Sequence, residues 1–186
     1  MNSKNFALFG GSFDPPHKGH QEIVESLLKL EKIDSVLIVP TYKNPFKDSF
    51  HATPKQRLKW CQTLFSSPNI VVSDYEILQQ RPVYTIETYN ALSKIYNIKA
   101  IVIGADNLKS ITKWRDFEKL NSKIEWIIAT RPNEELDTSA LQNYTLLPLN
   151  IDISSSEIRE GKKLEFVDSS IRKQVQKVYN IAKNQD

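Results

Sequence analysis

The sequence predicts an α/β protein of the Rossmann-like, doubly wound class, with a mainly parallel sheet flanked by helices and a C-terminal helical segment. Short apolar runs rich in β-branched and aromatic residues alternate along the chain with segments of helical periodicity. These runs are almost continuously hydrophobic, as is typical of strands buried on both faces of a parallel sheet. We expect strands at residues 6–9, 35–39, 70–72, 100–103, 125–129 and 144–147.

The first two helices are predicted from an apolar stripe and from a start signal. The stripe follows the first strand and consists of Ile23, Val24, Leu27, Leu28 and Leu30. Thr53, Pro54 and Gln56 are typical of an N-cap, a first-turn proline and the second half of a capping box. The helix that starts there should turn an apolar face inward, made of Leu58, Cys61, Leu64 and Phe65.

Two further helices follow from the same reasoning. One should begin after Thr85, and its core face consists of Ile86, Tyr89, Leu92 and Tyr96. The last should begin near Ser169 and pack against the body of the protein through Ile171, Val175, Val178 and Ala182.

Length and composition favour one compact domain spanning residues 1–186, with 40% hydrophobic residues to fill a core. Twenty-five Lys and Arg against 22 Asp and Glu make too weak a positive charge to indicate nucleic-acid binding. Cys61 is the sole cysteine, so no internal disulfide can form. No apolar run reaches the length of a signal-peptide core or a membrane span. We therefore expect a cytoplasmic protein with no membrane partner.

The clearest functional signal lies between the first strand and the first helix, in residues 8–20. Ligands bind at this edge of a doubly wound sheet. Gly10 and Gly11 leave room for a phosphate to approach the backbone, and Ser12 and Phe13 continue that turn. The N-terminus of the following helix offers free N–H groups and a positive dipole end, which favour an anion.

His17 and His20 are three residues apart, so both imidazoles lie on one face of the first helical turn and can reach one phosphate. Donors aimed at developing negative charge supply most of the catalysis in nucleotidyl transfer. An ordinary loop with a helix cap is the simpler interpretation of such a histidine pair, but each part of this run has its own phosphate-binding rationale. It is not a P-loop, because no Gly-Lys-Ser/Thr follows, and we predict no protein metal site.

These residues resemble the signature of the nucleotidyltransferases with a His-x-Gly-His motif, and most closely that of bacterial nicotinate-nucleotide adenylyltransferases. The resemblance implies that His17 and His20 contact the ATP phosphates and stabilise the transition state. It also implies that the backbone of Gly10, Gly11, Ser12 and Phe13 places the nucleotide.

A second run, residues 153–159, indicates a helix start with Ser154 and Glu157 as a capping box. Serine hydroxyls, free N–H groups and an arginine at a helix start can also bind an anion. The run is similar to the family's second signature, which implies that Ser155 and Ser156 hold the adenylate side and that Arg159 binds phosphate. Family members usually carry an arginine where Gly161 stands, so one phosphate contact expected from the family has no counterpart here.

The fourth strand ends at Gly104 and Asp106, where the carboxylate either caps the next helix or accepts a ribose hydroxyl. Trp114 follows, and its chemistry alone favours a packing role. Similarity to the nicotinate enzymes implies instead that Gly104 and Asp106 contact ATP and that Trp114 stacks on the pyridine ring.

The remaining site residues come from shorter segments. Lys47 follows the second strand and offers a mobile positive charge, although most surface lysines are merely solvated. The resemblance assigns Lys47 to catalysis and to the acceptor, with Phe46 where the family has a histidine. It places Tyr84 and Thr85 beside the mononucleotide, where Thr85 is explained equally well as a helix cap, and it places Arg131 near the substrate phosphates.

Taken together, the sequence predicts an enzyme that joins ATP to nicotinic acid mononucleotide, with His17, His20, Lys47 and Arg159 as catalytic residues and Mg²⁺ entering with ATP. One alternative is adenylyl or cytidylyl transfer to another acceptor, such as nicotinamide mononucleotide or phosphopantetheine. Another is a nucleotide-binding regulator without catalysis. A homo-oligomer is compatible with the sequence, which does not specify the oligomeric state.

Overall fold

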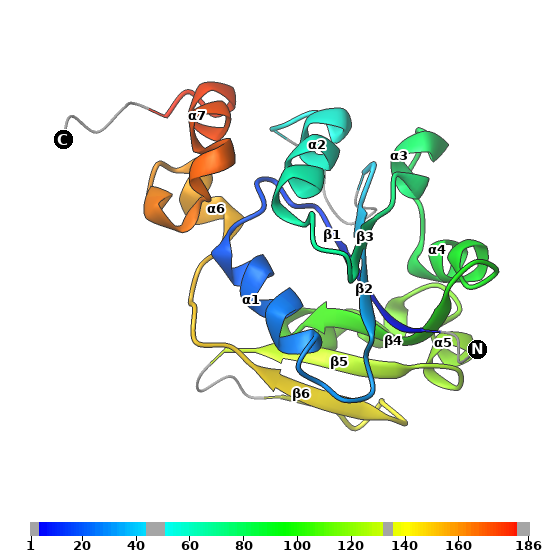
Figure 1. The fold of residues 1–186 in the computed structure, drawn as a ribbon. Coiled ribbons are helices and arrows are strands. Elements are labelled where there is room, and N and C mark those ends of the chain that lie inside the picture. Colours follow the sequence, from blue (N-terminus) through cyan, green and yellow to red (C-terminus); the bar gives the residue numbers. More distant parts are fainter. Residues whose placement is uncertain (1–3, 44–50, 132–135, 182–186) are drawn as a thin grey trace.

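The computed structural model describes residues 4–43, 51–131 and 136–181 (Figure 1). Six parallel strands form one sheet in the order β3-β2-β1-β4-β5-β6. This is the strand order of a doubly wound dinucleotide-binding fold, in which the order reverses between β1 and β4. The strands are β1 (Asn5–Gly11), β2 (Ser35–Pro40), β3 (Ile70–Val72), β4 (Asn97–Gly104), β5 (Glu125–Thr130) and β6 (Tyr144–Pro148). All six predicted strands are confirmed.

The helices include every one predicted from the sequence. They are α1 (Lys18–Leu27), α2 (Pro54–Leu64), α3 (Tyr75–Gln79), α4 (Thr85–Leu92), α5 (Phe117–Asn121), α6 (Ser155–Arg159) and α7 (Ser169–Val178), with 3₁₀ segments η1 (Ala105–Lys113) and η2 (Leu164–Phe166). The Thr53 hydroxyl accepts a hydrogen bond from the Gln56 amide at 3.2 Å, which confirms the predicted cap of α2. No described helix is both long and apolar enough to cross a lipid bilayer.

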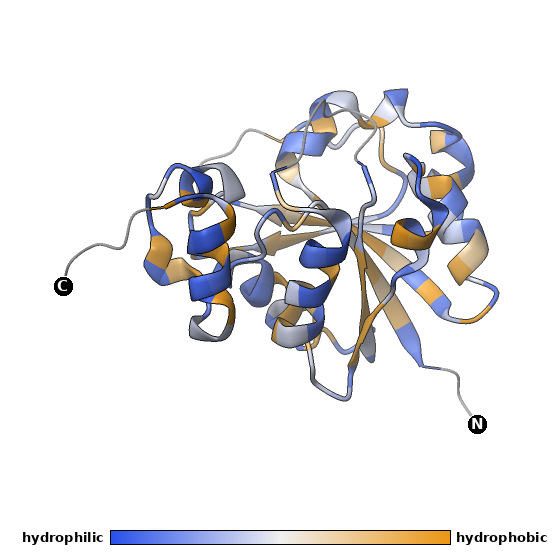
Figure 2. Cartoon of the chain, turned by 90° about the horizontal axis from the view of Figure 1, so that it is seen from above, coloured by the Kyte–Doolittle hydropathy of each residue, from blue (hydrophilic) through white to orange (hydrophobic). Residues whose placement is uncertain are grey.

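Two apolar clusters fill the two faces of the sheet, because successive strand residues point to opposite sides. On one face, α1 and α2 pack on Ala7, Val36 and Val102. On the other, α4, η1 and α5 pack on Leu8 and the alternate residues of the neighbouring strands. Figure 2 shows the strands largely in the hydrophobic colour and the surrounding helices with mixed colours. The sheet is therefore buried on both faces, as its continuous hydrophobicity predicted.

A third cluster joins the C-terminal part to the rest of the chain. Trp60 of α2 packs there with Ile153, Ile158, Ile171 and residues around them. The Trp60 ring nitrogen donates a 3.1 Å hydrogen bond to Gln174 of α7. As a result, α6 and α7 lie together beside α2 and the N-terminal end of α1 (Figure 1).

The predicted inward face of α2 is confirmed in part. Cys61 and Phe65 are buried as expected, and Leu58 and Leu64 are half-buried. Arg57 and Trp60, which were not predicted to face inward, are fully buried. The Arg57 guanidinium finds backbone acceptors inside the protein, which makes its burial possible. Hydropathy ranks arginine as a surface residue and so could not predict that Arg57 faces inward.

Candidate active site

The candidate site lies at the carboxyl ends of β1 and β4, where the strand order reverses. Gly10 and Gly11 end β1, Gly104 ends β4, and all three line one cavity. Thr85 and Trp114 also line this cavity, from α4 and from the residue after η1. The structure thus brings together residues that the sequence placed at one sheet edge.

The two histidines form a close pair at the start of α1. Their ring centroids lie 3.8 Å apart, and the His17 backbone N–H donates to Nδ1 of His20 at 3.2 Å. His17 is the N-cap residue of α1 and is buried, whereas His20 is half-buried. Nδ1 of His17 is buried and has no hydrogen-bond partner among the described residues. The pair therefore offers a ring nitrogen that a bound phosphate oxygen could satisfy.

Both imidazoles are neutral in this environment. Burial, and then the positive charge of Arg131, lowers the pKa of His17 to about 3. Burial, and then the field of His17, lowers the pKa of His20 well below its usual range. A neutral imidazole carries one N–H donor and one acceptor nitrogen, so each ring can donate one hydrogen bond to a phosphate.

Phe13 fixes the turn between β1 and the histidines. Its backbone is left-handed, with φ 49°, and its side chain is fully buried. The ring packs 4.9 Å from His20 and 5.4 Å from Phe9, centroid to centroid. A Cβ on Gly11 would lie 3.1 Å from the Phe13 ring, which is tighter than an ordinary contact, so a larger residue there would have to displace the ring. The loop is thus held by packing beneath the predicted phosphate site.

Arg57 was missed by the sequence reasoning, yet it holds two loops of the site. Its Nη1 donates to the Ser12 carbonyl at 2.6 Å and its Nη2 to the Tyr42 carbonyl at 2.9 Å. Its Nε donates to the Ala52 carbonyl at 3.3 Å. A planar guanidinium presents five N–H donors on three nitrogens in a fixed fork, so it can span acceptors that are too far apart for the single nitrogen of a lysine. Arg57 therefore ties the loop after β1 to the segment after β2.

Asp14 is a second residue that sequence reasoning did not single out for its role. Its buried carboxylate accepts hydrogen bonds from the His51 and Ala52 amides at 3.2 and 3.1 Å. It also accepts one from the Tyr179 hydroxyl at 2.7 Å. The first motif is thus joined to the segment just before α2 and to the end of α7.

The second motif is fastened onto the first. The Ser155 hydroxyl donates to the Pro15 carbonyl at 2.9 Å, and Nη1 of Arg159 donates to the Asp14 carbonyl at 2.6 Å. Nη2 of Arg159 donates to the Ser156 hydroxyl at 2.9 Å. The structure therefore brings these three predicted ATP-binding residues beside the histidine loop, where they also hold its backbone in place.

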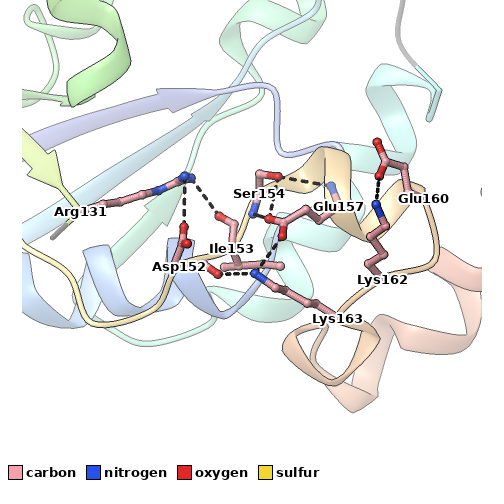
Figure 3. A network of polar contacts seen from close by, with 8 residues as sticks. All are labelled: Arg131, Asp152, Ile153, Ser154, Glu157, Glu160, Lys162 and Lys163. Atoms are coloured by element: carbon pink, nitrogen blue, oxygen red, sulfur yellow. Dashed lines mark hydrogen bonds and ion pairs between the residues drawn. The ribbon is translucent and has the colours of Figure 1, made fainter. Parts of the chain in front are cut away.

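The predicted capping box at the start of α6 is confirmed, and it belongs to a wider polar network (Figure 3). The Ser154 hydroxyl accepts from the Glu157 amide at 3.3 Å, while Glu157 accepts from the Ser154 amide at 2.9 Å. Lys163 pairs with Glu157 at 2.8 Å, and chiefly for this reason the pKa of Glu157 is lowered to about 2.

Arg131 approaches this network from the end of β5 (Figure 3). It pairs with Asp152 at 3.2 Å and donates to the Ile153 carbonyl at 3.2 Å. Its positive charge adds, after burial, to the lowering of the pKa of His17. Arg131 thus lies beside the second motif, through its contacts with Asp152 and Ile153.

The other end of the cavity is lined by aromatic residues. Trp114 packs edge-on against Trp126, 6.0 Å between ring centroids, and still lines the cavity. Tyr84 is the N-cap residue of α4, so Thr85 begins this helix without capping it. The guanidinium of Arg115, which the sequence did not single out, lies 5.1 Å over the Tyr84 ring. This end could take a flat ring, with Trp114 as its platform.

Asp106 and Lys47 are the remaining predicted site residues. Asp106 lies at the start of η1 without capping it, and its Oδ1 accepts from the Asn107 amide group at 3.1 Å. Lys47, together with Phe46, lies outside the described residues.

Gly161 has φ 79°, and a Cβ there would lie 3.3 Å from Ile181. The left-handed backbone therefore explains glycine where the family usually has arginine.

Comparisons with known proteins agree with this site. The model of the family described as "Cytidylyltransferase-like" matches residues 8–161. The "Probable nicotinate-nucleotide adenylyltransferase" of Sulfurovum sp. (strain NBC37-1) is 44% identical over 172 residues, which cover 92% of each chain. The protein of the same name from Campylobacter jejuni (strain RM1221) is 44% identical over 93% of this chain and 95% of its own.

Solved structures support the fold. "Plasmodium falciparum nicotinic acid mononucleotide adenylyltransferase complexed with NaAD" aligns with a TM-score of 0.80 at 22% identity, covering 97% of this chain and 100% of that one. One family is indicated by the sheet order, by the histidine pair at the edge where the strand order reverses, and by relatives that match over nearly their whole length. The chain belongs to the cytidylyltransferase-like family and, within it, to the nicotinate-nucleotide adenylyltransferases.

Proposed function

We propose that this chain transfers the adenylyl group of ATP to nicotinic acid mononucleotide, forming nicotinic acid adenine dinucleotide and pyrophosphate for NAD biosynthesis. The family supports this reaction, since relatives that match over nearly their whole length carry the name nicotinate-nucleotide adenylyltransferase. The observation that carries the chemistry is the neutral pair His17 and His20 at the N-terminus of α1, with a buried ring nitrogen of His17 that has no partner among the described residues.

The proposed step is an in-line displacement at the α-phosphorus of ATP. An oxygen of the acceptor's 5′-phosphate forms the new P–O bond, while the bond from the α-phosphorus to the bridging oxygen breaks and pyrophosphate leaves. His17 and His20 donate hydrogen bonds to the phosphate oxygens, where negative charge develops. The backbone of Gly10, Gly11, Ser12 and Phe13 places the nucleotide, with no covalent intermediate.

The other predicted ATP contacts are assigned to the same side of the site. Ser155, Ser156 and Arg159 already touch one another or the histidine loop, and a bound phosphate would compete for their donors. Gly104 ends β4, Asp106 lies just beyond it at the start of η1, and both are proposed to face the nucleotide. The Asp106 carboxylate is exposed, which suits acceptance of a ribose hydroxyl.

The acceptor is proposed to lie in the cavity between Trp114 and α4. Trp114 would stack on the pyridine ring, and Tyr84 and Thr85 would contact the mononucleotide. Arg131 and Lys47 would meet the phosphates, Lys47 on the strength of the family motif alone. Stacking on Trp114 is the reason for preferring a pyridine acceptor to phosphopantetheine.

Mg²⁺ is proposed to enter with ATP. His17 and His20 offer nitrogen donors, whereas Mg²⁺ prefers oxygen ligands, so the histidines would be free to contact phosphate. Mg²⁺ usually takes its ligands from substrate phosphates and water, which fits an ion that arrives with ATP. The ion would neutralise negative charge on the phosphates of the leaving group. We also propose that the chain acts in the cytoplasm as one nucleotidyltransferase domain; its sole cysteine, Cys61, is a free and buried thiol.

The test is pyrophosphate release from Mg²⁺-ATP with nicotinic acid mononucleotide, nicotinamide mononucleotide and phosphopantetheine in separate reactions. We expect the highest kcat/KM with the nicotinate substrate. Preference for phosphopantetheine would keep the chemistry and refute the role of Trp114. Tight ATP binding with no pyrophosphate release from any acceptor would refute catalysis and favour a regulator.

A further inference from the structure

A buried carboxyl group opens onto the proposed acceptor cavity. Glu76 of α3 is 5% exposed and lines the same cavity as Thr85 and Trp114. Its Oε1 accepts a hydrogen bond from the Thr88 hydroxyl at 2.7 Å. Its Oε2 is buried and has no hydrogen-bond partner among the described residues. Because an unpaired buried oxygen is costly, its position beside a cavity indicates a ligand that satisfies it.

The surroundings of Glu76 control whether this group can donate a hydrogen bond. Burial raises the pKa of Glu76 to about 7, and the negative charge of Glu87 on α4 adds to this. The hydrogen bond from Thr88 and the positive charge of Arg57 on α2 act in the opposite direction. Arg115 lines the same cavity. Near neutral pH the carboxyl group therefore exists both as a neutral donor and as an anionic acceptor.

We propose, on the basis of the proposed function above, that Glu76 is a specificity-determining residue whose free carboxyl oxygen hydrogen-bonds the substituent on the acceptor's pyridine ring. Neutral Glu76 donates its proton to the carboxylate of nicotinic acid mononucleotide. Ionised Glu76 has no proton to donate and repels that carboxylate. An amide carries both donor and acceptor groups, so nicotinamide mononucleotide can pair with either form of Glu76.

This proposal has a pH signature that a structural role for Glu76 would not produce. As pH rises through about 7, the neutral form disappears, and binding of the acid should weaken while binding of the amide does not. The ratio of kcat/KM for acid over amide removes effects common to both reactions, including titration of the ATP and acceptor phosphates. We expect this ratio to fall roughly tenfold between about pH 6.5 and pH 8.5 in the wild-type enzyme.

The decisive variant is Glu76→Gln. Its side-chain carbonyl can keep the bond from Thr88, while its amide group stands where Oε2 was and donates at every pH. The acid-to-amide ratio of this variant should be independent of pH, and at high pH it should exceed the wild-type ratio by about tenfold, mainly through KM for the acid. Glu25→Gln, the same change at an exposed carboxylate on α1, is the matched control and should follow the wild type.

The outcomes distinguish failure of the proposed role of Glu76 from failure of the proposed function. A wild-type enzyme that uses the acid with a pH-independent ratio overturns the role of Glu76 but leaves the proposed function standing, even if the variant does not fold. Equal changes of KM for both acceptors in Glu76→Gln would assign Glu76 to the shared ribose or to packing, and would also overturn it. A wild-type enzyme inactive on both acceptors would overturn the proposed function and this inference with it.

Discussion

The hydroxyl of Tyr179, at the end of α7, donates a 2.7 Å hydrogen bond to the carboxylate of Asp14, three residues before His17. The bond joins residues 165 positions apart and connects the C-terminal helix to the loop that carries the histidines. Burial, and then this hydrogen bond, raises the pKa of Tyr179, so the phenol stays protonated and remains a donor. The loop that carries the histidines is therefore tied to a helix that supplies none of the proposed substrate contacts.

Tyr179→Phe should lower the free energy of unfolding by about 1.5–3 kcal/mol, because it removes a buried hydrogen bond to a charged group. It should also lower kcat several-fold, since Asp14 keeps only its two backbone donors. Urea unfolding and steady-state kinetics measure the two effects. Tyr144→Phe, at an exposed tyrosine on β6, is the control. Unchanged stability and kcat in Tyr179→Phe would show that α7 does not position the loop.

His20→Ala should lower turnover by roughly 10²-fold or more, which is the scale for loss of one preorganised donor. The fold should remain intact, because His20 is only half-buried and the Phe13 packing beneath it persists. Single-turnover kinetics at saturating ATP and acceptor measure the chemical step, and circular dichroism checks the fold. A folded variant with full activity would refute the role of His20.

Trp114→Ala should raise KM for the acceptor far more than KM for ATP, with a loss of about 1–3 kcal/mol of stacking. Trp114 is only half-buried, so the fold should survive this change, although the edge contact with Trp126 is removed. Trp114→Phe retains a ring and should recover part of the affinity. If the alanine variant raises both KM values equally, Trp114 supports the fold instead of stacking on the acceptor.

Protonation of His17 should contribute to acid destabilisation. Its pKa is about 3 in the folded protein and about 6.5 unfolded, so below pH 6.5 the unfolded chain binds a proton that the folded one does not. The contribution is fully present above pH 6.5 and is lost as pH falls toward 3. From pH 7 to pH 5, wild type should lose about 2 kcal/mol more than His17→Gln in urea unfolding.

His51→Gln, at an exposed histidine, is the control for this comparison. It should lose stability in parallel with wild type over the same pH range. Parallel behaviour of His17→Gln and wild type would mean that His17 is not held neutral by burial.

The sequence was sufficient for the sheet and for the sheet edge at which the candidate site lies. The strands are continuous apolar runs, and glycines at the ends of β1 and β4 mark the edge where ligands bind. Local signals also predicted the caps at Thr53 and Ser154, because capping depends on residues three apart.

What the sequence could not predict depends on distant partners. Arg57 is buried because it meets the Ser12 carbonyl, and Glu76 because it meets Thr88 and the cavity. Hydropathy alone assigns both to the surface. Likewise, the contact of Ser155 with the Pro15 carbonyl spans 140 residues and has no local signature. The burial of these polar side chains depends on tertiary contacts, which local sequence motifs do not predict.

The most direct test of the central claim is to follow isotope from labelled ATP with nicotinic acid mononucleotide as acceptor. Attack at the α-phosphorus predicts that α-phosphate label appears in nicotinic acid adenine dinucleotide and that γ-phosphate label appears in pyrophosphate, with both rates lowered together in His20→Ala. Label from the γ-phosphate in the acceptor, or α-label that never enters a dinucleotide, would contradict adenylyl transfer at this histidine site.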